Sequence, residues 1–170
     1  MTQKAALFKS AIGSKTMTAP TPDDAEARLA GFIARFSPDV AARARDSVAA
    51  LRARLPGANL LVYDNYNALA VGFGATERSS DIVFSVAVFP RWVSLFLVGG
   101  PALHDPKGLL RGAGTTMRHI VLAEAGTLDD PDVRALMDQA LASAKAPIDS
   151  ALAGKLIIKS VSAKQRPRRA

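Results

Sequence analysis

The sequence contains no cysteine, and this absence removes several kinds of site at once. Without thiols the chain has no disulfides, no thiolate zinc site, no iron–sulfur ligation and no cysteine nucleophile. Only two histidines are present, His104 and His119, and neither an H-x-x-x-H nor an H-x-H spacing joins them. A transition-metal site would need both histidines together with carboxylates such as Asp105. We therefore predict neither a metal nor another cofactor.

Long apolar runs are also missing, and no segment is long or apolar enough to cross a bilayer. Near the N-terminus, the apolar stretch from Ala5 to Phe8 is interrupted at Lys9, which is far too short for the core of a secretory signal. These absences predict a cytoplasmic protein without a membrane partner. The 170 residues are 49% hydrophobic and 22% charged, close to a globular average, and the length favours one domain.

Motifs for nucleophilic catalysis are lacking as well. No G-x-S-x-G sequence is present, and Ser85 and Ser94 fall inside expected strands, where their hydroxyls face a neighbour or solvent. We predict a protein that is not an enzyme, with no catalytic residues.

The positive charge is concentrated at the two ends of the chain. Residues 1 to 20 contribute +3 and residues 155 to 170 contribute +6, both without a single acid. Residues 21 to 154 hold all 15 acids against 13 lysines and arginines, so the net charge of +7 belongs to the ends. We interpret 1–20 as a flexible basic leader, 21–154 as a single domain and 155–170 as a basic C-terminal tail.

Two amphipathic helices are predicted at the start of the domain. Thr21-Pro22 and Ser37-Pro38 each place a capping hydroxyl before a proline suited to the first helical position. Apolar residues then recur at helical spacing up to Pro56-Gly57. A third helix is predicted after Asp130-Pro131 by the same chemistry.

Between these helices the pattern changes to short strands separated by turn residues. The expected strands lie near 60–63, 68–74, 82–89, 92–98 and 117–123, and Pro90-Arg91 is the strongest hairpin signal. Short links favour antiparallel pairing, since a parallel return needs a crossover of about a dozen residues or more. The prediction is an α+β fold with two N-terminal helices, an antiparallel sheet of about four to five strands and a C-terminal helix. Leu156-Ile157-Ile158 could add an edge strand.

The loop from Asp105 to Arg118 is the most distinctive stretch of the sequence. Gly112 and Gly114 expose backbone amides, and Lys107, Arg111 and Arg118 supply cations that could cradle an anion. The alternative is a tight connection with arginines on the sheet surface.

A second unusual stretch is Tyr63-Asp64-Asn65-Tyr66-Asn67, where two phenol groups and a carboxylate offer hydrogen bonds beside ring faces. Such a cluster fits either the wall of a small-ligand pocket or a turn between strands.

The residues from Asn59 to Ala144 resemble the YdhG-like family, a bacterial domain of unknown function. The segments that carry the resemblance are residues 61–69, 93–96, 103–114 and 118–120. The resemblance implies a compact α+β domain with a frataxin-like shape, and one branch of the family has been linked to iron delivery. It implies no catalytic residues.

Three functional hypotheses follow. The first is a non-catalytic module that binds an unknown small molecule or protein partner through six residues: Tyr63, Asp64, Tyr66, Lys107, Arg111 and Arg118. The second, implied by the resemblance, is a frataxin-like iron-binding chaperone. The third is association with nucleic acid through residues 155–170, which lack the aromatic side chains that stack on single strands.

Overall fold

Two helices open the part of the chain that the computed structural model describes, residues 21 to 170. Helix α2 spans Pro22–Ala34 and helix α3 spans Pro38–Arg54. The Thr21 hydroxyl accepts a hydrogen bond from the amide of Asp24, whose carboxylate accepts one from the Thr21 amide. The side-chain hydrogen bond with Thr21 lowers the pKa of Asp24. Both predicted N-terminal helices are present, while the predicted leader, 1–20, lies outside the described residues.

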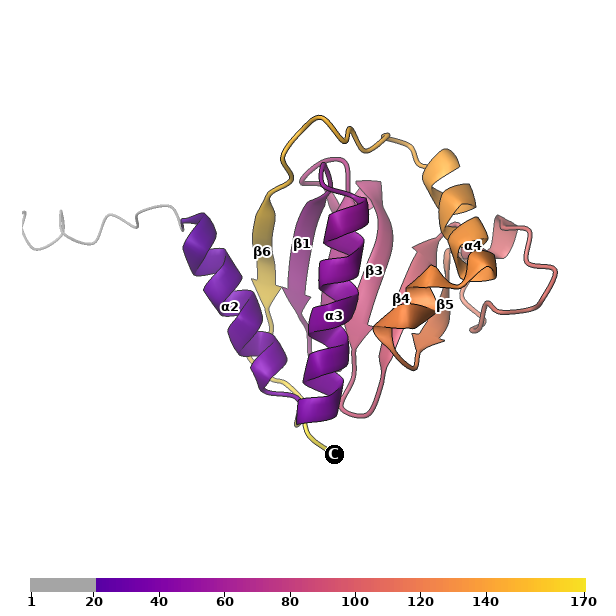
Figure 1. Ribbon diagram of the computed structural model, residues 1–170. Helices are drawn as coiled ribbons and strands as arrows, with labels where there is room; N and C mark the ends of the chain where they lie inside the picture. Colours follow the sequence, from indigo (N-terminus) through magenta and orange to yellow (C-terminus); the bar gives the residue numbers. More distant parts are fainter. Residues whose placement is uncertain (1–20) are drawn as a thin grey trace, which may run out of the picture.

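Six strands form one sheet behind the helices (Figure 1). The order across the sheet is β5-β4-β3-β2-β1-β6. Strands β1 to β5 pair antiparallel with their neighbours in sequence, and β6 pairs parallel with β1. The strand bounds are β1 Asn59–Asp64, β2 Leu69–Gly74, β3 Ile82–Val88, β4 Val93–Val98, β5 Met117–Leu122 and β6 Leu156–Val161.

The predicted antiparallel pairing is confirmed for β1 to β5, whereas the predicted count of four to five strands is too low, because β6 adds a sixth strand that runs parallel to β1. The sixth strand, β6, contains the apolar run that suggested an edge strand. Residues 123 to 155, which include helix α4 (Pro131–Ala142), connect β5 to the far edge of the sheet. A connection of this length allows the chain to return parallel to β1.

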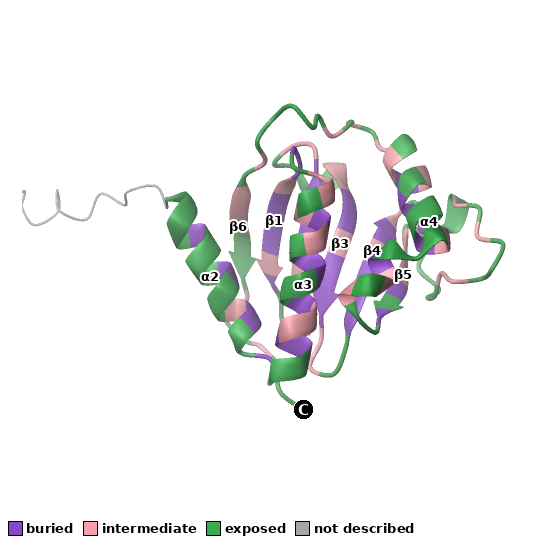
Figure 2. Ribbon diagram, in the orientation of Figure 1, coloured by how far each residue is buried: buried purple, intermediate pink, exposed green. Residues whose placement is uncertain are grey.

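The core lies between the helices and one face of the sheet. The three helices of the described residues, α2, α3 and α4, cover the same side, and their buried stripes meet the strands there (Figure 2). Alternate strand residues such as Val62, Val86 and Leu95 point into this core. Their neighbours in sequence point to the opposite face, which we call the open face.

The crossover before β6 approaches the backbone of the α3–β1 connection very closely. A Cβ added at Gly154 would lie 1.7 Å from the carbonyl oxygen of Ala58. At Gly31, which is exposed on α2, an added Cβ would meet no atom within 4 Å. The two glycines therefore form a matched pair for mutation.

We predict opposite effects for Gly154→Ala and Gly31→Ala. Backbone must move to admit the methyl group at residue 154, so Gly154→Ala should lower the free energy of unfolding by about 1 to 3 kcal/mol. Gly31→Ala should raise it by up to about 1 kcal/mol, because alanine is the better helix former. Urea denaturation followed by circular dichroism measures both. A Gly154→Ala variant as stable as the wild type would contradict the close approach.

Candidate functional site

A buried carboxylate stands at the end of strand β1. The register places Asp64 opposite Leu69, on the face that packs against the helices, and only 1% of the residue is exposed. A charge in such surroundings needs partners, because desolvation of an unpaired carboxylate is costly. Two arginines supply them: Nη2 of Arg168 lies 2.8 Å from one carboxylate oxygen, and Nη1 of Arg35 lies 3.2 Å from the other.

Arg168 is as buried as the carboxylate it meets, with 3% of the residue exposed. Its guanidinium also donates to the backbone oxygens of Asn65, at 2.5 Å, and Tyr66, at 3.4 Å. The same group lies 5.6 Å from the centre of the Phe36 ring, a cation–π distance. Arg168 thereby joins the C-terminal segment to the β1–β2 hairpin and to the end of α2.

The neighbours of Arg168 fasten the same segment to the domain. The amide of Ser162 and the side chain of Gln165 both donate to the carbonyl oxygen of Asp64. The amide of Arg166 donates to the carbonyl oxygen of Tyr66 at 2.9 Å, and Nε of Arg169 donates to that of Arg35 at 3.2 Å. Residues 155–170, interpreted from the sequence as a tail, instead form an edge strand and then a segment bonded to the domain. The physical reason is that Asp64 is buried and requires the cation.

The tip of the β3–β4 hairpin lies beside this segment. The rings of Phe89 and Trp92 stack with their centres 4.8 Å apart and 21° between their planes. Trp92 remains 43% exposed. A hollow of about 520 Å³ separates the hairpin tip from the C-terminal residues, and its lining is Asn67, Phe89, Pro90, Arg91, Trp92, Arg166, Pro167, Arg169 and Ala170.

The exposed residues around this hollow combine aromatic rings with positive charge. We call Tyr66, Arg91, Trp92, Arg166 and Arg169 the aromatic–arginine patch. Tyr66 is 51% exposed and precedes the lining residue Asn67 without belonging to the lining itself. Its residues come from three separate parts of the sequence: the β1–β2 hairpin, the β3–β4 hairpin and the C-terminal segment.

The arginines of the patch are not neutralised by acids of the chain. The lining of the hollow contains no Asp or Glu side chain. Among residues 21 to 170, no ion pair involves Arg91, Arg166 or Arg169, and residues 1 to 20 contain no acid. The Arg166 side chain donates to the neutral Asn67 amide at 3.3 Å. The patch is therefore a basic surface with cations available to an anionic ligand.

The six site residues predicted from the sequence do not meet in one place. Tyr63, Asp64 and Tyr66 belong to β1 and its hairpin, while the loop that contains Lys107 and Arg111 leads into β5. Strands β2, β3 and β4 lie between β1 and β5. At about 4.8 Å per strand, the two groups are roughly 19 Å apart across the sheet.

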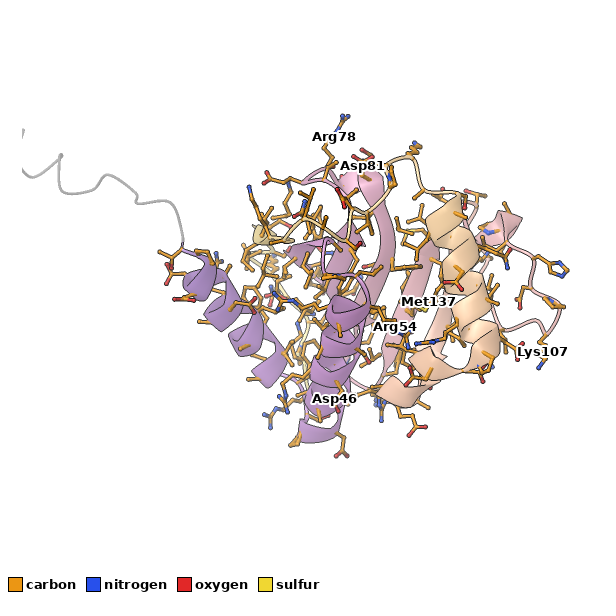
Figure 3. All side chains as sticks on the ribbon, turned by 45° about the horizontal axis from the view of Figure 1, so that its top comes forward. Asp46, Arg54, Arg78, Asp81, Lys107 and Met137 are labelled. Carbon is orange, nitrogen blue, oxygen red and sulfur yellow. The ribbon has the colours of Figure 1, made fainter. Side chains whose placement is uncertain are left out.

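The glycine-rich loop is held by its own contacts. The Asp105 carboxylate accepts hydrogen bonds from the amides of Leu109 and Leu110, both at 2.9 Å. Lys107 pairs with Asp132 at 2.6 Å, and the hydrogen bond to Asp132 raises the pKa of Lys107. Figure 3 shows Lys107 at the outer side of the molecule, beyond α4.

Arg118 and Arg111 complete that loop. Nε of Arg118 donates to the carbonyl oxygen of Gly114 at 2.9 Å, so the Arg118 side chain is bonded to the backbone of the loop. Arg111 and His119 exchange two backbone hydrogen bonds, of 2.8 and 3.0 Å, beside the outer edge of β5. The loop is thus a tight connection, as in one of the two interpretations from the sequence, and Arg111 lies at the edge of the sheet.

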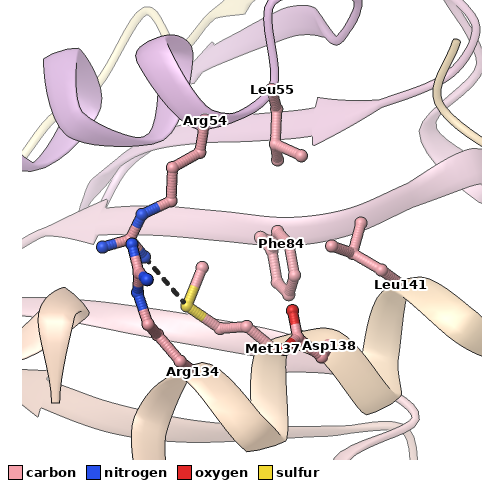
Figure 4. Close-up of a pocket in the computed structure, with 7 residues that line it drawn as sticks. All are labelled: Arg54, Leu55, Phe84, Arg134, Met137, Asp138 and Leu141. Carbon is pink, nitrogen blue, oxygen red and sulfur yellow. Dashed lines mark hydrogen bonds between the residues drawn. The ribbon is translucent and has the colours of Figure 1, made fainter. Parts of the chain in front are cut away.

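A smaller hollow of about 270 Å³ lies between α3 and α4, with Phe84 as part of its lining (Figure 4). Its two arginines already have partners in the protein. Arg54 donates to the carbonyl oxygen of Leu128 at 2.8 Å and pairs with Asp129, and Arg134 approaches the same carboxylate. This hollow therefore offers less uncompensated charge than the aromatic–arginine patch.

Residues 21 to 170 contain no group of three or more His, Asp or Glu side chains placed to hold a metal ion. His119 instead lies against Phe96, with ring centres 5.1 Å apart. In the same range, no helix has the length and apolar character needed to span a membrane.

Sequence reasoning missed Trp92, Arg91 and the stacked Phe89 as site residues. It treated the C-terminal arginines as lacking aromatic neighbours, because none are near them in sequence. One signal was available: the hairpin prediction at Pro90-Arg91 places the only tryptophan of the chain beside an exposed turn.

We predict that Asp64→Ala lowers the free energy of unfolding by about 3 to 5 kcal/mol, since it leaves the buried Arg168 guanidinium without its carboxylate. The control is Glu26→Ala, which breaks the exposed 2.6 Å pair with Arg52 and should cost no more than about 1 kcal/mol. Urea denaturation at neutral pH measures the two losses. Equal losses would show that the Asp64 pair does not fix the fold.

No family model, curated protein or solved structure matches this chain. The resemblance to the YdhG-like family stays a prediction from the residues quoted for it.

Proposed function

We propose that the protein is a non-catalytic module that binds nucleic acid at the aromatic–arginine patch. The observation that carries this proposal is the exposed indole of Trp92, which shares one hollow with Arg91, Arg166 and Arg169. Bases would stack on the aromatic rings and phosphates would pair with the guanidinium groups.

The aromatic part suits base stacking. Phe89 holds the Trp92 ring in a stack while a large part of the indole faces solvent. Tyr66 adds a second exposed ring on the neighbouring hairpin. Each base stacked on an aromatic side chain contributes about 1 to 3 kcal/mol, and the contribution depends little on sequence because every base has a π face.

The charged part suits phosphate. Arginine presents a planar fork of donors that matches phosphate oxygens and stays ionised at any physiological pH. The net charge of +7 favours approach of a polyanion, and the uncompensated arginines determine where it binds. Each nucleotide of a nucleic acid contains both a base that can stack on an aromatic ring and a phosphate that can pair with an arginine.

The patch is also preorganised. Arg168 and the backbone bonds of Arg166 and Arg169 fix the C-terminal segment before any ligand arrives. A disordered basic tail would have to lose conformational entropy on binding, whereas this segment has already done so. The proposal thus keeps the nucleic-acid hypothesis and replaces its flexible tail with a folded surface.

The single tryptophan allows a direct test of the proposal. Titration of the wild-type protein with a single-stranded 12-mer should quench Trp92 fluorescence saturably. If three phosphates are neutralised, the slope of log K against log salt should be about −2. An unchanged emission spectrum in the presence of oligonucleotide would reject the proposed function.

Variants then separate stacking from charge, with a labelled 12-mer followed by anisotropy. Trp92→Ala should weaken binding about 5- to 150-fold. Replacing both Arg166 and Arg169 by alanine should make the salt slope shallower by about 1.4. The control is Arg78→Ala, an exposed arginine beyond the opposite end of β2, which should behave as the wild type. Equal effects of all three changes would contradict a localised site.

A further inference from the structure

The aromatic–arginine patch continues onto the open face of the sheet along strand β4. Val93 and Leu95 are fully buried in the core, so Trp92, Ser94 and Phe96 point to the open face by the alternation of a strand. Val121 and His119, the register partners of Ser94 and Phe96 on β5, share that face. A strip of side chains therefore leads from Trp92 to the Phe96–His119 pair.

The open face differs from the usual solvent-facing side of an antiparallel sheet, which is polar. Two rows of register partners cross it, and neither contains Lys, Arg, Asp or Glu. Small residues occupy the central strands β2 and β3, and the Ile82 side chain packs over one of them, Gly72. The rows are Ile157, Leu61, Gly72, Ser85, Phe96 and His119, and Ser160, Tyr63, Ala70, Ala87, Ser94 and Val121.

Polar groups on this face lack partners within the described residues. Ser94 is 1% exposed, and neither its Oγ nor the buried hydroxyl of Tyr63 makes a hydrogen bond. Both oxygens are covered by neighbouring atoms of the protein, so a ligand on the face would meet them only after a side chain moves. Unpaired buried polar groups are rare in folded proteins, and bound ligands are one explanation.

A cation also stands at the far end of the strip. The backbone of Arg111 pairs with His119 on the outer side of β5. Its exposed side chain forms no ion pair among residues 21 to 170. The strip therefore has an aromatic ring and an arginine at each end: Trp92 with Arg91, and Phe96 with Arg111.

We infer that a single-stranded segment of nucleic acid lies along β4, from the aromatic–arginine patch to Phe96, His119 and Arg111. This inference rests on the proposed function and names its substrate as single-stranded. Four residues at about 3.4 Å each separate the two stacking positions by roughly 14 Å. Bases must leave a duplex to stack on a flat aromatic surface, so paired strands do not fit the strip.

The test compares oligonucleotides of two lengths on the full chain. A 2-mer should quench Trp92 but not reach Phe96, because two linked nucleotides span less than the roughly 14 Å between the stacking positions. A 12-mer should use the whole strip and bind at least about tenfold more tightly. A duplex of 12 base pairs should bind at least about tenfold more weakly than the single strand. Phe96→Leu keeps apolar bulk and removes the ring, so it should weaken 12-mer binding at least about fivefold and leave 2-mer binding unchanged.

Two further variants sharpen the comparison. Arg111→Ala should reduce the salt slope for the 12-mer by about 0.7 and leave the slope for the 2-mer unchanged. Val161→Ala, at an exposed apolar position on the opposite edge strand, is the control and should change neither.

The outcomes distinguish this inference from the proposed function. Quenching by both lengths with equal affinity, or a Phe96→Leu variant identical to the wild type, would overturn the strip and leave the patch. Absence of quenching by every oligonucleotide would overturn both. A wild-type dimer in sedimentation that Phe96→Leu dissociates would assign the open face to a second copy of the chain and also overturn the strip.

Discussion

The ion pair between Asp64 and Arg168 is the interaction on which the rest of the structure depends. A carboxylate at the end of β1 is buried against the helices, and the cation that neutralises it comes from a residue 104 positions later. Because Arg168 is buried and Asp64 otherwise has only the half-exposed Arg35 beside it, the C-terminal segment packs across the β1–β2 hairpin. The same packing brings Arg166 and Arg169 to the hairpin that contains Trp92. The ion pair that stabilises the fold therefore also positions the arginines of the aromatic–arginine patch, to which we assign binding.

The sheet has two faces with different roles. One face carries the helices α2, α3 and α4 and the apolar core. The other carries aromatic, aliphatic and small residues, without charged side chains in its two central rows. Parallel strand β6 matters to both, because it covers the edge of β1 and delivers the C-terminal arginines to the end of the sheet. The fold thus places its basic residues at the rim of an uncharged aromatic surface.

Local sequence signals predicted the helices and most strands because their causes are local. Thr21-Pro22 and Asp130-Pro131 encode helix starts within a few residues, and alternating apolar residues encode β2. The pairing of Asp64 with Arg168 depends on two distant segments meeting, which no window of sequence contains. Tyr66 was chosen from the sequence for its polar and aromatic neighbours, whereas Trp92 was missed because two of the three arginines beside it, Arg166 and Arg169, are remote along the chain.

The distance in sequence between Asp64 and Arg168 also sets an order of events during synthesis. Strands β1 to β5 can pair as soon as they leave the ribosome, because each joins the strand before it. At that stage Asp64 has only Arg35, and the two hairpin tips lack their basic neighbour. The surface around Trp92 is completed when the chain has been made as far as Arg169. A chain that ends before Arg168 therefore lacks both the buried partner of Asp64 and the basic side of the surface around Trp92, so the same residues complete the fold and the capacity to bind.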